Sequence, residues 1–272
     1  MIRIGTIWDR TAEVIAGRGG IIAWLAGMFL FLPAVVQAVM RPVAGGAPSP
    51  GLALLAALLG LAVAALAIWG TLAITALASD PAVTRGEAIA IGQRRLPAAI
   101  GVLLCGMGIA LVVSLVPIAL IASSGFDFAR AQRGLDQPHF DAARAAPAVL
   151  LLALLFIVAL WASARLLPLF AVVVNERRGL RAFARAFALT RGFGLRLIGV
   201  LLLYGLVSVI VLTAATWVSG VVAGLVFGAG GALWTALVVA LVGAGVTAGI
   251  SVVQSVFGAQ FYVATRDRTD AA

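Results

Sequence analysis

Residues 176–194, ERRGLRAFARAFALTRGFG, concentrate the side chains of this chain that could bind an anion. Guanidinium groups pair with phosphates and carboxylates, so the segment could contact nucleic acid, assist a reaction or hold the protein at an anionic membrane surface. Phenylalanines Phe183, Phe187 and Phe193 lie among the cations. The candidate anion-binding or interface residues are Arg177, Arg178, Arg181, Arg185 and Arg191.

A second group of reactive side chains surrounds the only histidine, His139, within FDFARAQRGLDQPHFDAAR. Asp136 and Asp141 flank it closely enough for a weak metal site, and Asp127 lies further away. Phosphodiester hydrolysis needs converging carboxylates and histidines, and intramembrane Ser–His proteolysis needs a histidine at membrane depth. No Walker-type or dinucleotide-binding glycine motif occurs either. We therefore expect an ordinary polar loop here, and a protein without catalytic residues, cofactor or bound metal.

The composition is that of a membrane protein. Of the 272 residues, 63% are hydrophobic and 11% are charged, whereas a soluble domain is about half apolar and about a quarter charged. Apolar runs of about 20 residues or more, the length that crosses a bilayer, recur along the chain. We predict an all-α polytopic protein that forms a single integral membrane domain over 1–272, with six spans at 20–40, 52–78, 97–123, 147–173, 196–226 and 232–263.

Arginine alone supplies the net charge of +9, because the sequence contains no lysine. Cytoplasmic loops of membrane proteins are enriched in basic residues. With the N-terminus inside, the outer segments hold only Arg41, Arg130, Arg133 and Arg144. The inner segments then hold Arg3, Arg10, Arg18, Arg85, Arg94, Arg95, Arg177, Arg178, Arg181, Arg185, Arg191, Arg196, Arg266 and Arg268. Both termini are therefore predicted to be cytoplasmic.

Each predicted outward span follows a short amphipathic segment. Residues 3–16, 84–95 and 179–190 space their apolar side chains as a helix would, and such helices lie in the membrane interface. The middle segment opens with TRGE, a capping box in which Thr84 and Glu87 satisfy each other's free amides. The chain is therefore predicted to repeat one unit three times, an interfacial helix followed by a helical hairpin. The pentapeptide IGVLL, at 100–104 and 198–202, either supports this repeat or recurs by chance.

Helical spacing also bears on what the arginine-rich segment binds. Leu180, Phe183, Ala184 and Phe187 share one face, and the arginines lie on another. Nucleic-acid binding requires exposed aromatic rings among the cations, so we expect no nucleic acid. The arginines either anchor an interfacial elbow, bind acidic lipid headgroups or contact a partner. At an anionic leaflet, each basic residue contributes about 1 kcal/mol to membrane binding. The expected partners are membrane lipids with anionic headgroups, with a membrane protein or a second copy of the chain as alternatives.

The segment VNERRGLRAFARAFALTRG, preceded by SARLLPLF at 163–170, resembles the membrane domain associated with glycerophosphodiester phosphodiesterases and with related bacterial inner-membrane proteins. Ala186 stands where that family often has serine. The resemblance implies the fold and a bacterial inner-membrane location, but no activity, and we expect no separate phosphodiesterase domain within these residues. The matching positions are Arg165, Pro168, Glu176, Gly179, Arg185, Leu189, Thr190 and Gly192.

Few polar side chains lie inside the predicted spans. Arg165 is the one ionisable group, and Glu176 lies about 16 Å further along the same helical face, too far for a pair within one helix. Arg165 therefore either snorkels to the membrane boundary or binds a ligand. Thr247, Ser251 and Ser255 share a face of the sixth span. We expect a non-enzymatic role in membrane organisation, and the alternative is a facilitator or carrier for an amphipathic or lipid-like solute.

Small residues recur every four positions in the last two spans, where they allow helices to approach closely in lipid. A short GAGG link at 228–231 joins these spans, so a tight hairpin is predicted, with a homodimer seam as the alternative. The predicted helix-packing residues are Gly220, Gly224, Gly228, Gly245 and Gly249.

Overall fold

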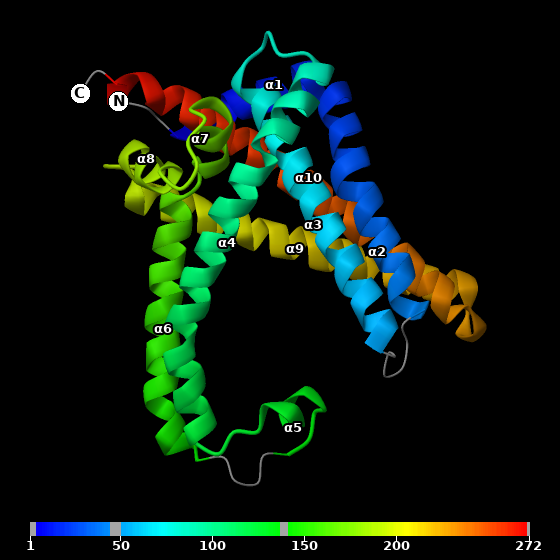
Figure 1. The fold of residues 1–272 in the computed structure, drawn as a ribbon. Helices are drawn as coiled ribbons and strands as arrows, with labels where there is room; N and C mark the ends of the chain where they lie inside the picture. The colour runs from blue at the N-terminus through cyan, green and yellow to red at the C-terminus, as the bar shows by residue number, and fades with distance from the viewer. Residues whose placement is uncertain (1–3, 44–49, 137–140, 271–272) are drawn as a thin grey trace.

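The protein is a bundle of long helices, seen in a computed structural model that describes residues 4–43, 50–136 and 141–270 (Figure 1). Within these ranges the chain forms helices and short links, with no strand. Six helices are long and apolar enough to cross a membrane. The predicted all-α, multi-pass fold with six spans is therefore confirmed for the described residues.

The spans pair into three hairpins, α2 with α3, α4 with α6 and α9 with α10 (Figure 1). Helices form here because lipid offers no water to satisfy an open backbone. Both chain ends gather with α7, α8 and the first turns of α4 and α9 at one end of the bundle, which we call the basic end. The elements are α1 (Ile4–Ala26), η1 (Gly27–Phe31), α2 (Leu32–Val43), α3 (Pro50–Ser79), α4 (Arg85–Ser123), α5 (Phe128–Gln132), α6 (Ala142–Arg165), α7 (Leu169–Asn175), α8 (Ala182–Leu189), α9 (Gly194–Phe227), η2 (Ala229–Gly231) and α10 (Ala232–Asp270).

The first span bends where the predicted interfacial helix ends. The helical stretch is continuous from Ile4 to Met40, but Arg18 leaves helical geometry, with φ −123° and ψ 16°. The residues before Arg18 correspond to the predicted segment 3–16, and those after it to the predicted span 20–40. The π-helical turn η1 comes just before Pro33, whose nitrogen has no hydrogen for the helix ladder.

The prediction of a separate interfacial helix at 84–95 is wrong. α4 runs unbroken for 39 residues from Arg85 to Ser123. At about 1.5 Å per residue it is about 58 Å long, against a hydrocarbon core of about 30 Å, so part of it extends beyond the lipid. Thr84 and Glu87 form the predicted capping box, which starts a helix but does not end one. The three predicted hairpins are present, whereas the second elbow helix of the repeat is not.

The fourth span, predicted as continuous over 147–173, is interrupted. α6 ends at Arg165, residues 166–168 form a turn, and α7 begins at Leu169. Pro168 explains the break, because it cannot donate to the Ala164 carbonyl four residues earlier and its ring crowds that carbonyl. Ala171 and Val172 of α7 are at most 2% exposed. α7 is therefore enclosed by the bundle instead of extending a lipid-facing helix.

A large cluster of buried side chains surrounds α7 at the basic end. One cluster of buried side chains joins α3, α4, α7, α8 and α10, with Leu72, Val102, Val172, Leu189 and Tyr262 among its members. Along the rest of α4, α6 and α9 many leucine and valine side chains are exposed. In a membrane, lipid tails cover such side chains, so the basic end supplies most of the protein-to-protein core.

Gly70 of α3 marks a close approach between the first two spans. A Cβ added to Gly70 would lie 2.4 Å from the Cβ of Phe29 in η1, and the Phe29 ring is held against Trp69 with centroids 5.0 Å apart. We expect Gly70→Ala to reduce the free energy of unfolding by about 2 kcal/mol, because overpacking forces the two helices apart. Equilibrium unfolding in mixed detergent micelles measures this loss.

The matched control for that substitution is Gly101→Ala in α4, where a Cβ would meet no other atom within 4 Å. Alanine favours a helix over glycine, so this variant is expected to be as stable as the wild type or more stable. Equal stabilities for the two variants would contradict the close contact at Gly70.

α9 and α10 form the predicted hairpin, but only some of the predicted glycines allow it. A Cβ on Gly220 would lie 3.4 Å from Val239 of α10, so Gly220 does permit close packing. A Cβ on Gly224 or Gly249 would meet nothing within 4 Å, and one on Gly245 would meet Phe31 of the first span at 3.8 Å. These three glycines therefore do not bring α9 and α10 together in this chain, and Gly245 faces the first span instead.

Two other glycines shape this hairpin. Gly228 caps the end of α9 with φ +63°, a left-handed conformation that glycine adopts without strain. Its role is the turn and not helix packing. Gly243 would place a Cβ 3.4 Å from Thr216 of α9, so it belongs to the helix contact although the four-residue spacing omitted it.

Candidate functional site

Glu176 is the centre of an ion-pair cluster at the basic end. Arg185 Nε lies 2.9 Å from one of its carboxylate oxygens, and Arg178 Nε lies 2.9 Å from the other. The side chains of Glu176 and Arg185 are both 14% exposed. Tyr262 of α10 also lies against the carboxylate. Arg185 is therefore held by Glu176 and is not free to bind a lipid phosphate as predicted, and Arg178 is held in part.

Four arginines of the predicted patch are exposed, namely Arg177, Arg178, Arg181 and Arg191, and of these only Arg178 pairs with Glu176. Arg177 follows the C-cap of α7 and has φ +56°, in the left-handed region where helix ends usually place glycine. A side chain other than glycine costs about 1 kcal/mol there. Strained residues that persist in a fold cluster at functional sites. The chain thus holds a guanidinium at the surface where glycine would be more stable.

α4 brings two further cations, Arg94 and Arg95, to the same surface. Arg95 lies close enough to Arg177 and Arg94 for their charges to act on its own, and its Nε is buried without a hydrogen-bond partner. In the described part of the chain, no carboxylate pairs with any of these three arginines. Like charges this close repel unless an anion lies between them. Neither α4 residue was among the predicted patch residues.

α8 lies between the exposed Arg181 and Arg191 and is packed against protein. Its buried side chains are Ala182, Ala186 and Leu189, whereas Leu180 lies before the helix and is 60% exposed. The predicted apolar face, which included Leu180 and Ala184, is therefore wrong by about one position. The small alanines let α8 approach the bundle closely. A prediction of the buried face that relies on the large apolar side chains overlooks this contact.

Phe183 and Phe187 remain on the packed side of α8. Phe187 contacts the ring of Trp161 in α6, with centroids 5.6 Å apart. Phe183 packs against the buried cluster and approaches Gly106 of α4. The aromatic rings therefore fix α8 to α4 and α6.

Arg165, the last residue of α6, packs against the start of α9. Its guanidinium carbon lies 5.4 Å from the centroid of the Trp161 ring, and its Nη2 lies 3.6 Å from where a Cβ of Gly194 would be. Its Nε is buried without a hydrogen-bond partner. α9 begins beside it without a side-chain cap on Phe193. The uncapped N–H groups of a helix start and an unpaired guanidinium both favour an anion.

Several of the residues on which the resemblance rests lie near this helix end. The Thr190 hydroxyl lies 2.9 Å from the Ala186 carbonyl oxygen and 3.4 Å from that of Arg165, which ties α8 to the end of α6. Leu189 is 2% exposed in the core. Gly192 has φ +82°, so the turn into α9 favours glycine. Ala186 is fully buried, where a serine hydroxyl would face the core.

A polar cavity of about 180 Å³ lies between α3, α10 and the break in the fourth span. Ser251 and Ser255, predicted as part of a polar face, line it together with Gln254. Thr247 is not among the lining residues, and neither is Arg165. α3 contributes Thr71 and Thr75, which were not predicted although they repeat the four-residue spacing of Ser251 and Ser255. The four-residue spacing of hydroxyl residues that predicts a polar helix face was therefore present in both helices.

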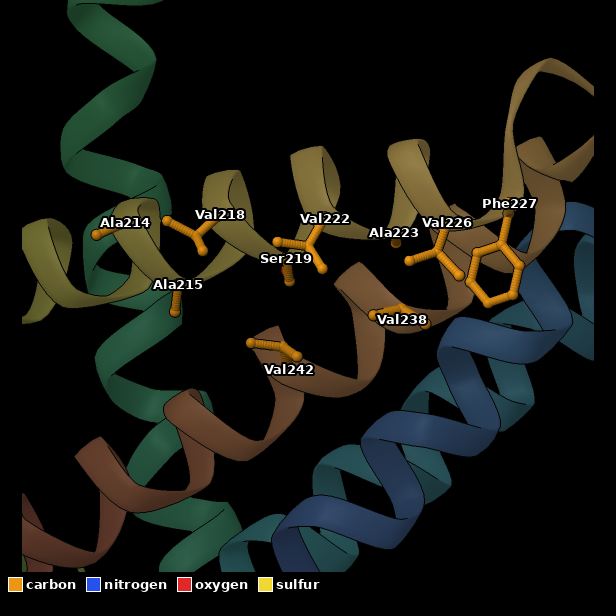
Figure 2. Close-up of a pocket in the computed structure, with 10 residues that line it drawn as sticks. All are labelled: Ala214, Ala215, Val218, Ser219, Val222, Ala223, Val226, Phe227, Val238 and Val242. Carbon is orange, nitrogen blue, oxygen red and sulfur yellow. The ribbon is translucent and has the colours of Figure 1, made fainter.

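A larger hollow of about 650 Å³ lies between α9 and α10 (Figure 2). Valine, alanine and phenylalanine line it, and the hydroxyl of Ser219 already donates to the Thr216 carbonyl. Figure 2 shows Val218, Val222 and Val226 in a row along α9. The lining of this hollow is almost entirely apolar, so it fits lipid tails.

The loop around His139 is only partly described, because residues 137–140, His139 included, lie outside the described ranges. Asp127 and Asp141 accept hydrogen bonds from backbone N–H groups at the starts of α5 and α6, so both act as N-caps. Among the residues that the structure does describe, no three His, Cys, Asp or Glu side chains gather as a metal site requires.

Together these features define a multi-pass α-helical membrane protein with a cation-rich surface at one end and a small polar cavity beneath it. Comparisons of the chain with protein-family models, with curated proteins and with solved structures found no match.

Proposed function

We propose that the basic end binds the phosphate groups of acidic membrane lipids and that the protein has a non-enzymatic role in membrane organisation. The proposal places the chain in a bacterial inner membrane with both termini in the cytoplasm, because basic loops face that side. The resemblance of residues 163–170 and 174–192 to the membrane domain associated with glycerophosphodiester phosphodiesterases supports membership of that family.

An excess of unpaired cations at the basic end carries this proposal. Glu176 is the only acidic residue between Asp141 and Asp267, and its two oxygens already face Arg178 and Arg185. Arg177, Arg181 and Arg191, which Glu176 does not pair, are exposed and lie next to helices of membrane-spanning length, where headgroup phosphates would reach them if the protein sits in a membrane as proposed. An anionic lipid would neutralise them without any further change in the fold.

The test is lipid binding by a variant that loses the exposed cations but keeps the Glu176 cluster, Arg177→Gly/Arg181→Ala/Arg191→Ala. Each cation contributes about 1 kcal/mol, so phosphatidylglycerol should bind about 100-fold more weakly than to the wild type. Native mass spectrometry of the full chain, titrated with phosphatidylglycerol or phosphatidylethanolamine, measures this. Arg177→Gly relieves the left-handed strain, so weaker binding would not result from unfolding.

The matched control is Arg130→Ala/Arg133→Ala/Arg144→Ala, which removes three exposed arginines from the opposite end. This variant should keep the affinity and the preference of the wild type for phosphatidylglycerol. If both triple variants bind the two lipids equally well, the arginines at the basic end set only the orientation in the membrane and the proposal is wrong.

A further inference from the structure

The polar cavity between α3, α10 and the α6–α7 break is independent of the lipid surface, since no arginine lines it. Its polar side chains are all neutral, and they come from two helices, Thr71 and Thr75 on α3 and Ser251, Gln254 and Ser255 on α10. Polar groups inside a membrane bundle are expensive unless they are satisfied. The cavity therefore raises the question of what these groups contact.

The four hydroxyls offer hydrogen-bond acceptors to the cavity. Each of them donates its hydrogen to the backbone carbonyl four residues earlier in its own helix, at 2.7–2.9 Å. A hydroxyl has one hydrogen and two lone pairs, so the lone pairs remain free once the hydrogen is used. A ligand that suits these hydroxyl oxygens is a cation or a strong hydrogen-bond donor.

The cavity lining contains no carboxylate, and this favours a cation of charge +1 over a divalent one. Asp and Glu do not occur among the lining residues, whereas protein sites for Ca²⁺ or Mg²⁺ usually include carboxylates. Neutral hydroxyl and carbonyl oxygens are sufficient for ions of charge +1. At about 180 Å³, against about 30 Å³ for each water, the cavity has room for a small ion that keeps some of its waters.

The broken helix is the second observation that points to a ligand. Irregular backbone at membrane depth occurs where it is buried in protein or lines a cavity, and unwound carbonyls of discontinuous helices coordinate ions there. Leu167 and Phe170, on either side of Pro168, both line the cavity. The Leu167 carbonyl oxygen would be 3.0 Å from a Cβ on Gly258 of α10, so the irregular turn and α10 are in close contact.

We propose that this cavity binds one small monovalent cation, either an alkali ion or ammonium, between the hydroxyl oxygens of α3 and α10. The bound cation joins the second and sixth spans beside the break in the fourth. It therefore stabilises the bundle at the point where the helix ladder is interrupted.

Thermal unfolding of the purified full chain, in sodium, potassium, ammonium or choline chloride at equal ionic strength, tests this proposal. At least one of the three small cations should raise the unfolding temperature by about 2–4 °C over choline, whose methyl groups keep hydroxyl oxygens away from its charge. The comparison among the three separates an alkali ion from ammonium. Binding of radioactive sodium or rubidium, or a competition with ammonium, should be saturable at one site for each chain.

The decisive variant is Ser251→Ala/Ser255→Ala, because these hydroxyls bond only to their own helix within the described structure and their loss leaves the fold intact. It should bind the cation about tenfold more weakly and lose the thermal shift. The control is Ser114→Ala, whose hydroxyl makes the same bond on the exposed face of α4. Gln254→Leu provides a second variant at the cavity.

Two results would overturn the proposal. One is a wild-type protein whose unfolding temperature is the same in all four salts and that binds no cation saturably. The other is undiminished cation binding by both cavity variants, which would place the ion elsewhere. Neither result affects the lipid proposal, because the lipid test changes arginines that do not line the cavity.

Discussion

Glu176→Gln is expected to reduce the free energy of unfolding by about 3 kcal/mol. The substitution removes the charge between Arg178 and Arg185, and the Arg185 side chain, only 14% exposed, then has no counter-charge at Glu176. Removing one partner of a buried ion pair costs about 3–5 kcal/mol, and we take the lower end because both groups retain some solvent. Equilibrium unfolding in mixed detergent micelles measures the loss.

A double-mutant cycle shows whether this loss belongs to the pair. Arg185→Gln alone should be destabilising, and Arg185→Gln in the Glu176→Gln background should add much less, with a coupling energy above about 1 kcal/mol. The matched control is Arg144→Ala, since Arg144 and Asp141 form an ion pair with side chains 76% and 45% exposed. Exposed pairs contribute about 0–1 kcal/mol. If the effects of the Glu176 and Arg185 substitutions simply add, the ion pair between them is not the source of the lost stability.

This ion pair also shows why the site was only partly predictable. Arg185 is nine residues after Glu176, so one continuous helix would not bring their side chains together. The chain reverses after α7 through the left-handed Arg177, and this turn places Arg185 of α8 beside the carboxylate. Sequence periodicity describes neighbours within a helix and not across a turn. The exposed arginines were therefore predicted as a group, but not which of them were already paired.

The proline residues show a similar limit to what the sequence predicts about the fold. Pro97 and Pro117 lie inside the unbroken α4, whereas Pro168 separates α6 from α7. The residue type is identical, and membrane helices tolerate proline where neighbouring groups satisfy the freed carbonyl. Composition and apolar length therefore predict where spans occur. Whether a span continues through a proline is decided by packing, which at Pro168 encloses α7 within the bundle.

The structural role of Arg18 was not predicted from the sequence, where it counted only as one of the basic residues on the inner side. Its guanidinium donates to the carbonyl oxygens of Leu77, Asp80 and Val83, at 2.7, 3.2 and 2.6 Å. The last carbonyls of a helix lack partners within it, and a cation suits that end of the helix dipole. Arg18 thus joins the bend of the first span to the α3–α4 link.

Arg18→Ala is expected to destabilise the protein by about 3 kcal/mol, because hydrogen bonds to a charged group contribute about 1.5–3 kcal/mol each and two of these are part-buried. Arg18→Lys should recover only part of the loss, since a single ammonium cannot span the three carbonyls as the planar guanidinium does. Hydrogen exchange in residues 77–84 should accelerate in Arg18→Ala if the link opens locally. The control is Arg10→Ala on the exposed side of α1, which should change stability by less than about 0.5 kcal/mol. An Arg18→Ala variant as stable as that control would mean that α3 and α4 are held by their own packing, and that the positive charge at position 18 serves orientation alone.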